Sequence, residues 1–335
     1  MARRTEEFDS AWRSLSGQSS GHGWRSIPVA KAGRWQILAA RRAPTDEEAV
    51  VVSFPAATPS PPSLLPEGRG FMVEVARVEE VPGVWLAIAR KDAAQMDLFK
   101  AMLADLCDWL EGATGLNDGG AMSGFLARVR AWQDFMQRGG QPLSPEREVG
   151  LFGELVLMRS LLNAGYPAAL AVESWIGPLR AEQDFHIGSG AIEAKSTTAS
   201  TGFPAKVRSL AQLDDSTRSP LYICGVKLRV EQGGTSLPWL VDELCGTIAA
   251  EQGPVRDFHD RLLGAGYLLQ HAPRYERRFF IQELVFLHVG PGFPRLTAAS
   301  VSAGVLDVRY EIDLDQCGGP RITCASDVLK KMGVV

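Results

Sequence analysis

Two acidic residues and a lysine stand close together at Asp184, Glu193 and Lys195. The segment Gly188-Ser189-Gly190 lies between the two acids and is flanked by short alternating apolar and polar runs, a pattern typical of a β-hairpin. A two-residue loop would place Asp184 opposite Glu193 and put Lys195 on the same face of the hairpin. A three-residue loop would break this arrangement, so the prediction depends on the loop length.

Carboxylates that face each other on paired strands repel, and a fold alone gives no reason to place them so. A divalent cation of the Mg²⁺ type would balance the pair, because hard cations take carboxylate oxygens as ligands. Lys195 offers a simpler explanation, in which a surface carboxylate pair is neutralised by one lysine and does no chemistry. For an arbitrary hairpin this simpler interpretation is the favoured one.

A third carboxylate on a predicted helix shifts the balance. Ser144 is suited to cap a helix that has Pro145 in its first turn and ends near residues 163–165. Apolar residues recur at helical spacing along it, at Leu151, Leu155, Met158 and Leu162. Glu154 falls at the edge of this stripe, where we expect partial burial. A partly buried carboxylate needs a hydrogen-bond partner or a metal.

These features, taken in order, resemble the PD-(D/E)xK nuclease superfamily. The resemblance is carried by residues 150–155, Trp175-Ile176-Gly177-Pro178, Asp184-Phe185, residues 192–198 and residues 209–214. These segments are similar to one branch, the PD-(D/E)XK motif proteins found in bacterial defence and restriction gene neighbourhoods. The likeness covers most of the chain, with specific motifs in its central third. One departure is Gln183, which stands where the motif often has proline.

The resemblance implies an α/β (α+β) fold of the restriction-endonuclease-like type, with a mixed central sheet flanked by helices. It implies a Mg²⁺- or Mn²⁺-dependent endonuclease that hydrolyses DNA and acts in phage defence. The implied catalytic residues are Asp184, Glu193, Lys195 and Glu154, and the three acids are also the implied metal ligands. DNA is the expected partner. Other defence-system subunits are further possible partners, and a homodimer is expected by analogy. Gln212 is a weaker candidate for a residue beside the active site.

The alternative is a non-catalytic nucleic-acid-binding or assembly subunit that kept the nuclease fold. A formal net charge of −4 and the lack of an obvious basic stripe favour it. Candidate residues for a local basic face are Lys206, Arg208, Arg218, Arg274, Arg277 and Arg278. For any one of these, ordinary solvated surface charge is the commoner explanation.

The composition excludes several other classes. The chain has 335 residues, of which 45% are hydrophobic and 22% charged, values ordinary for a soluble globular protein. Five scattered cysteines without a CxxC motif argue against a zinc site or a disulfide framework. No apolar run is long enough for a membrane span or a signal peptide, so a cytoplasmic location is expected. The sequence also lacks the phosphate-loop, GxSxG and HExxH motifs.

Periodicity divides the chain into three parts. Residues 1–90 form a β-rich N-terminal module, with a helix at 5–16 and strands at 35–40, 49–54, 70–78 and 84–89. Residues 91–140 form a helical connector, with helices at 93–110 and 122–137. Residues 141–335 form the nuclease-like core with a C-terminal β/α extension. After the hairpin, this core is predicted to contain a loop at 196–205, a short helix at 209–213, strands at 220–230, 279–289 and 305–314, and helices at 237–251 and 255–263.

Overall fold

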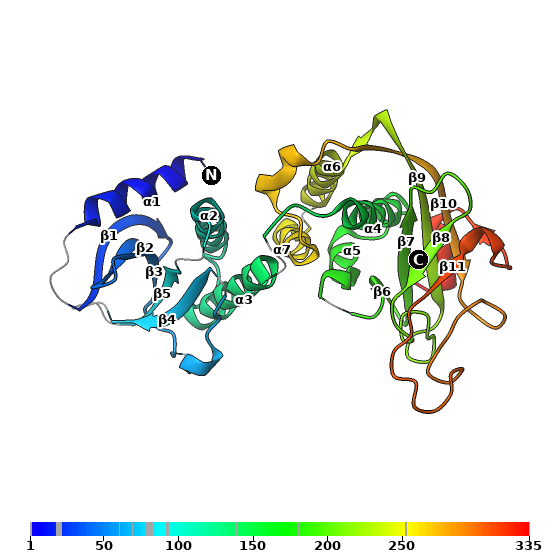
Figure 1. Ribbon diagram of the computed structural model, residues 1–335, viewed down its shortest axis with the longest axis horizontal. Coiled ribbons are helices and arrows are strands. Elements are labelled where there is room, and N and C mark those ends of the chain that lie inside the picture. Colours follow the sequence, from blue (N-terminus) through cyan, green and yellow to red (C-terminus); the bar gives the residue numbers. More distant parts are fainter. Residues whose placement is uncertain are drawn as a thin grey trace. The chain divides into compact units, whose positions relative to one another are not determined.

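The computed structural model divides the chain into two compact units, Met1–Gln141 and Pro142–Val335 (Figure 1). The structure describes residues 2–17, 22–59, 61–68, 70–77, 83–91, 94–137, 140–179, 181–251 and 253–334. Val78 and Ala93, at the ends of two predicted segments, lie outside these ranges. The predicted helical connector at 91–140 falls within the first unit. Within the described ranges, no helix is long and apolar enough to cross a membrane.

The first unit is built on an antiparallel sheet of order β1-β2-β3-β5-β4. Its strands are β1 (Gly23–Ala32), β2 (Trp35–Ala43), β3 (Glu47–Phe54), β4 (Phe71–Ala76) and β5 (Val84–Arg90). The helices are α1 (Ala2–Leu15), α2 (Met96–Gly112) and α3 (Asp118–Gln137), with a short 3-10 turn at Pro62–Leu64. Strand β1 was not predicted, because it is an edge strand of mostly half-exposed residues whose register shifts at Pro28.

Helix α3 begins at Asp118, four residues before the predicted start at Met122. Gly119 and Gly120 favour a break before Met122, since glycine is a poor helix former. The structure starts the helix there because the side chain of Asn117 accepts a hydrogen bond of 2.8 Å from the backbone N–H of Gly120. A capping side chain thus outweighs the low helix propensity of two glycines.

The second unit contains a five-stranded sheet of order β12-β10-β9-β7-β6 and a separate two-stranded β8–β11 pair. Its strands are β6 (Phe185–Ile187), β7 (Gly190–Thr197), β8 (Pro204–Val207), β9 (Leu221–Ser236), β10 (Arg278–His288), β11 (Tyr310–Asp313) and β12 (Arg321–Ile322). Strands β7 and β9 are parallel and the other pairs are antiparallel, so the sheet is mixed. The mixed sheet flanked by helices confirms the predicted fold class.

The helices of this unit pack mainly against one face of the sheet (Figure 1). They are α4 (Pro145–Asn163), α5 (Ala168–Ser174), α6 (Leu237–Ala250), α7 (Val255–Ala265) and α8 (Ala325–Lys331), with 3-10 turns at Gly177–Leu179, Leu269–Arg274 and Leu314–Gln316. Phe185, Ile187 and Ile192 point into the core on the helical face, as the alternation of the hairpin predicted. Ala191, on the opposite face of β7, joins a second core that includes Ala205 of β8.

Two predicted elements differ in the structure. Residues 209–213 form bends and a turn, not a helix. Their polar backbone groups are bonded by side chains, as in the 2.9 Å hydrogen bond that Gln183 Nε2 donates to the carbonyl of Ala211. The predicted strand at 305–314 shrinks to β11, and β8 forms inside the predicted loop at 196–205 and just beyond it. Strands β8 and β11 pair with each other across a long sequence separation, which local patterns do not reveal.

Candidate active site

The hairpin β6–β7 has the two-residue loop on which the predicted geometry depends. Ile187 pairs with Gly190 and Phe185 with Ile192, so the loop is Gly188-Ser189 and the next position outward sets Asp184 opposite Glu193. Gly188 adopts a φ of +56°, a left-handed conformation that glycine accepts without strain. The backbone N–H of Ala194 donates a 2.8 Å hydrogen bond to Asp184 Oδ2. Strand β7 therefore positions the aspartate directly.

Glu193 is the most deeply buried acid of the site, with 2% of the side chain exposed. Its Oε1 atom accepts hydrogen bonds from Lys195 Nζ at 2.6 Å and from Gln212 Nε2 at 2.7 Å. Its Oε2 atom is buried and has no hydrogen-bond partner among the described residues. Burial, together with the negative charge of Asp184, raises the pKa of Glu193 to about 8. Burial also raises the pKa of Asp184.

Gln212 reaches this site although its segment is not helical. Its Oε1 atom accepts a 2.8 Å hydrogen bond from the backbone N–H of Arg208, which fixes the direction of the amide. The amide nitrogen then points at Glu193. Because the amide oxygen already has a donor, Gln212 presents only its N–H groups to the carboxylate. Gln212 thus lies beside the site as predicted, but on a turn, because the predicted helix at 209–213 does not form.

Glu154 enters the site from helix α4, which begins and ends where predicted. Ser144 caps it by accepting a hydrogen bond from the backbone N–H of Arg147 at 3.4 Å. Glu154 Oε2 accepts a 2.8 Å hydrogen bond from the indole Nε1 of Trp175. Burial raises the pKa of Glu154 well above its ordinary value, and the charge of Asp184 raises it further. Four separate segments therefore bring charged or polar groups to one place.

Comparison with known proteins identifies the family of this chain. Residues 8–315 match the family described as "Putative PD-(D/E)XK family member (DUF4420)". The chain belongs to this family. No curated protein and no solved structure matches the chain. Membership of a PD-(D/E)XK family indicates a nuclease-type function.

PD-(D/E)XK nucleases generally use divalent metals, and the donor atoms of this chain suit such an ion. Glu193 Oε2 is a buried carboxylate oxygen that still lacks a partner among the described residues. Asp184 supplies a second carboxylate, whose charge is close enough to affect the pKa of Glu193. In the described part of the chain, no group of three or more His, Cys, Asp or Glu residues is placed to hold a metal ion. Two carboxylates completed by waters and a substrate phosphate are, however, a usual Mg²⁺ environment.

The other residues singled out in the sequence of this PD-(D/E)XK family member are placed as follows. Ser196 Oγ is buried against helix α4, with no hydrogen-bond partner in the described ranges. Arg277 is bound to Glu148 at 2.7 Å, so it does not belong to an open basic face. Arg218 Nη1 donates to the carbonyl of Gly188. Arg208 is exposed next to the site, where its charge opposes the rise in the pKa of Asp184.

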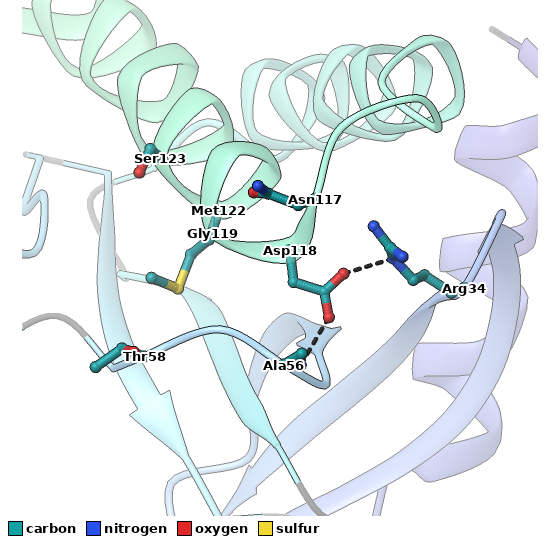
Figure 2. A pocket seen from close by; sticks show the side chains of 8 residues that line it. All are labelled: Arg34, Ala56, Thr58, Asn117, Asp118, Gly119, Met122 and Ser123. Atoms are coloured by element: carbon teal, nitrogen blue, oxygen red, sulfur yellow. Dashed lines mark hydrogen bonds and ion pairs between the residues drawn. The ribbon is translucent and has the colours of Figure 1, made fainter.

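The first unit of this family member contains a separate pocket of about 640 Å³, shown in Figure 2. Asp118 points across it toward Arg34 and toward the backbone of Ala56, with an ion pair of 2.6 Å and a hydrogen bond of 2.6 Å. Asp118 Oδ1, which pairs with Arg34, also accepts a 3.0 Å hydrogen bond from Trp35 Nε1. The charged groups of the pocket thus satisfy each other, and they include no carboxylate–lysine pair of the kind found on the hairpin.

Proposed function

We propose that this protein is a metal-dependent endonuclease that hydrolyses phosphodiester bonds of DNA, and that it serves a restriction-type role in phage defence. The observation that carries the proposal is the meeting of Asp184, Glu193 and Lys195 on one hairpin, with Glu154 beside them. Family membership supports a nuclease. The DNA substrate, the metal and the defence role rest on the resemblance of the motif segments to defence-associated proteins.

In this proposal Asp184 and Glu193 hold the ion. A bound Mg²⁺ or Mn²⁺ would supply positive charge for the scissile phosphate and would acidify an attacking water. Glu193 offers its Oε2 atom, which has no partner within the described part of the chain, while Lys195 and Gln212 keep the other oxygen in place. That Glu154 joins as a third ligand stays a prediction, since its Oε2 atom is already engaged by Trp175.

Lys195 is the proposed catalytic cation. Its ammonium lies 2.6 Å from Glu193 and its side chain is 11% exposed, so it is held in a fixed place with limited access to solvent. From there it can orient a water molecule or donate to a non-bridging phosphate oxygen. Because it is paired with a proposed metal-ligating carboxylate, the ammonium can take either role without moving.

The test is cleavage of supercoiled plasmid DNA in Mg²⁺ and in Mn²⁺. We expect nicked and linear products with the wild type, loss of at least ~100-fold in rate with Lys195→Ala, and wild-type rates with the matched control Lys331→Ala, which removes an exposed lysine of α8. Equal cleavage by the wild type and Lys195→Ala would refute the catalytic assignment. An analogous panel of RNA substrates decides between DNA and RNA.

A non-catalytic nucleic-acid-binding or assembly subunit is the second candidate. The ion pair between Lys195 and Glu193 favours it, because that pair neutralises the buried acid without any metal. The net charge of −4 also favours it. Absence of cleavage by both proteins, together with DNA retention in a gel-shift assay, would support this alternative. Sedimentation of the free and DNA-bound protein tests the expected homodimer.

A further inference from the structure

The segment Trp175-Ile176-Gly177 contacts two of the candidate acids at once. Trp175 donates its indole N–H to Glu154 Oε2 at 2.8 Å. The backbone N–H groups of Ile176 and Gly177 both donate to the carbonyl of Asp184, at 2.8 and 3.0 Å. Nothing in the chemistry of phosphodiester hydrolysis requires a tryptophan, so the segment must act through the acids that it holds.

Trp175 is itself fixed by the core. It is fully buried, its ring stacks on Phe185 at 6.4 Å between centroids, and it packs on Phe258 at 5.9 Å. The carbonyl of Trp175 also accepts a hydrogen bond from Arg261 of helix α7. Because the ring cannot turn, its N–H defines where the carboxylate of Glu154 lies.

Gly177 sets the distance of the segment from Asp184. A Cβ atom at this position would lie 2.6 Å from Asp184 Oδ1 and 3.2 Å from its Cα. Any side chain here would therefore push the aspartate away from its place opposite Glu193. The close approach lets two backbone donors reach the carbonyl of the same residue.

We propose that Trp175 and Gly177 are positioning residues that hold Glu154 and Asp184 at a fixed separation and thereby set the affinity of the site for a divalent cation. The inference rests on the proposed function. It concerns a segment outside the hairpin, and it explains why a buried tryptophan and a glycine accompany the acids. Second-layer hydrogen bonds to ligating carboxylates typically change metal affinity by about 10- to 100-fold.

The test is a Mn²⁺ titration followed by thermal shift. Trp175→Phe keeps an aromatic ring in the core but removes the N–H donor, and we expect it to bind Mn²⁺ about 10- to 100-fold more weakly. Trp12→Phe is the matched control, since Trp12 is also buried and donates its Nε1 to a backbone carbonyl, that of Ala49, in the first unit. This control should leave Mn²⁺ affinity unchanged.

A double-mutant cycle separates positioning from general destabilisation. In a Glu154→Ala background, Trp175→Phe should cause no further loss of Mn²⁺ affinity, because the group through which it acts is gone. A loss of equal size in both backgrounds would overturn the role of Trp175.

Gly177→Ala provides an independent variant, with Gly246→Ala as its control, since a Cβ atom at 246 meets nothing within 4 Å. We expect Gly177→Ala to weaken Mn²⁺ binding at least ~10-fold and Gly246→Ala to bind as the wild type. A wild type that binds neither Mg²⁺ nor Mn²⁺ would overturn the proposed function and the positioning role together. Binding that persists unchanged in Trp175→Phe and Gly177→Ala would overturn the positioning role alone.

Discussion

Replacing Glu193 with glutamine should flatten the pH dependence of stability in the metal-free protein. Burial raises the pKa of Glu193 from 4.5 to about 8. Between these values the folded protein keeps a proton that the unfolded chain releases, so the folded state binds more protons. Stability is therefore greatest below pH 4.5 with respect to this group and is lost as the pH rises toward about 8.

The size of the effect follows from the same two values. The difference between about 8 and 4.5 is about 3.5 pK units. At ~1.4 kcal/mol per unit, the full loss approaches about 5 kcal/mol. For a unit of this size, that corresponds to roughly 10–20 °C in the midpoint of thermal unfolding. Because neighbouring Asp184 titrates with Glu193, the measured change belongs to the cluster as a whole.

The assay is scanning calorimetry of wild type and Glu193→Gln in EDTA, at intervals from pH 5 to 8. The substitution also shifts all midpoints of the variant by a similar amount, so the comparison uses the slope. Glu276→Gln, at an exposed position, is the control and should keep the wild-type slope. Equal slopes for wild type and Glu193→Gln, or a wild type that gains stability with rising pH, would refute the reasoning.

Three further predictions test single contacts. Gly153→Ala should lower the free energy of unfolding by ~1–3 kcal/mol, because a Cβ atom would lie 1.7 Å from Ser196 Oγ; urea unfolding should show partial recovery when Ser196→Ala is added. Asp118→Ala should destabilise the protein by ~2–3 kcal/mol in thermal unfolding, as it leaves the buried indole N–H of Trp35 and the partly buried N–H of Ala56 without this acceptor. Gln212→Ala removes a donor to ionised Glu193, so the pH–rate profile of plasmid cleavage should move to higher pH, and an unmoved profile would contradict this contact.

The features predicted well from the sequence are those set within one element or one tight turn. The strand period of two and the loop at Gly188-Ser189 determine that Asp184 faces Glu193 and that Lys195 lies on the same side. The bounds of helix α4 were predicted equally well, because Ser144 caps the helix and its apolar stripe is regular. In both cases the information lies within about twenty residues, so local geometry suffices.

Elements that depend on distant partners were missed or misplaced. Strand β8 exists because β11, about a hundred residues later, pairs with it. The composition of the segment around Gln212 predicts a helix. Side chains such as Gln183 instead form hydrogen bonds with its backbone and stabilise a non-helical conformation. In both cases the partners lie far away in the sequence, and the propensity of the segment alone does not identify them.

The tertiary part of the site shows the same division. Glu154 was expected to need a partner because its helix places it at the edge of the buried stripe, and this expectation required no knowledge of the fold. The identity of that partner, Trp175, follows only when α4 and the segment after α5 pack together. Gly177, two residues later, carries the clearest signal. A Cβ atom at this position would lie 2.6 Å from Asp184 Oδ1, so the position accepts no side chain. A glycine beside a buried tryptophan, placed shortly before an acidic hairpin, thus indicates a close backbone approach whose target only the three-dimensional structure identifies.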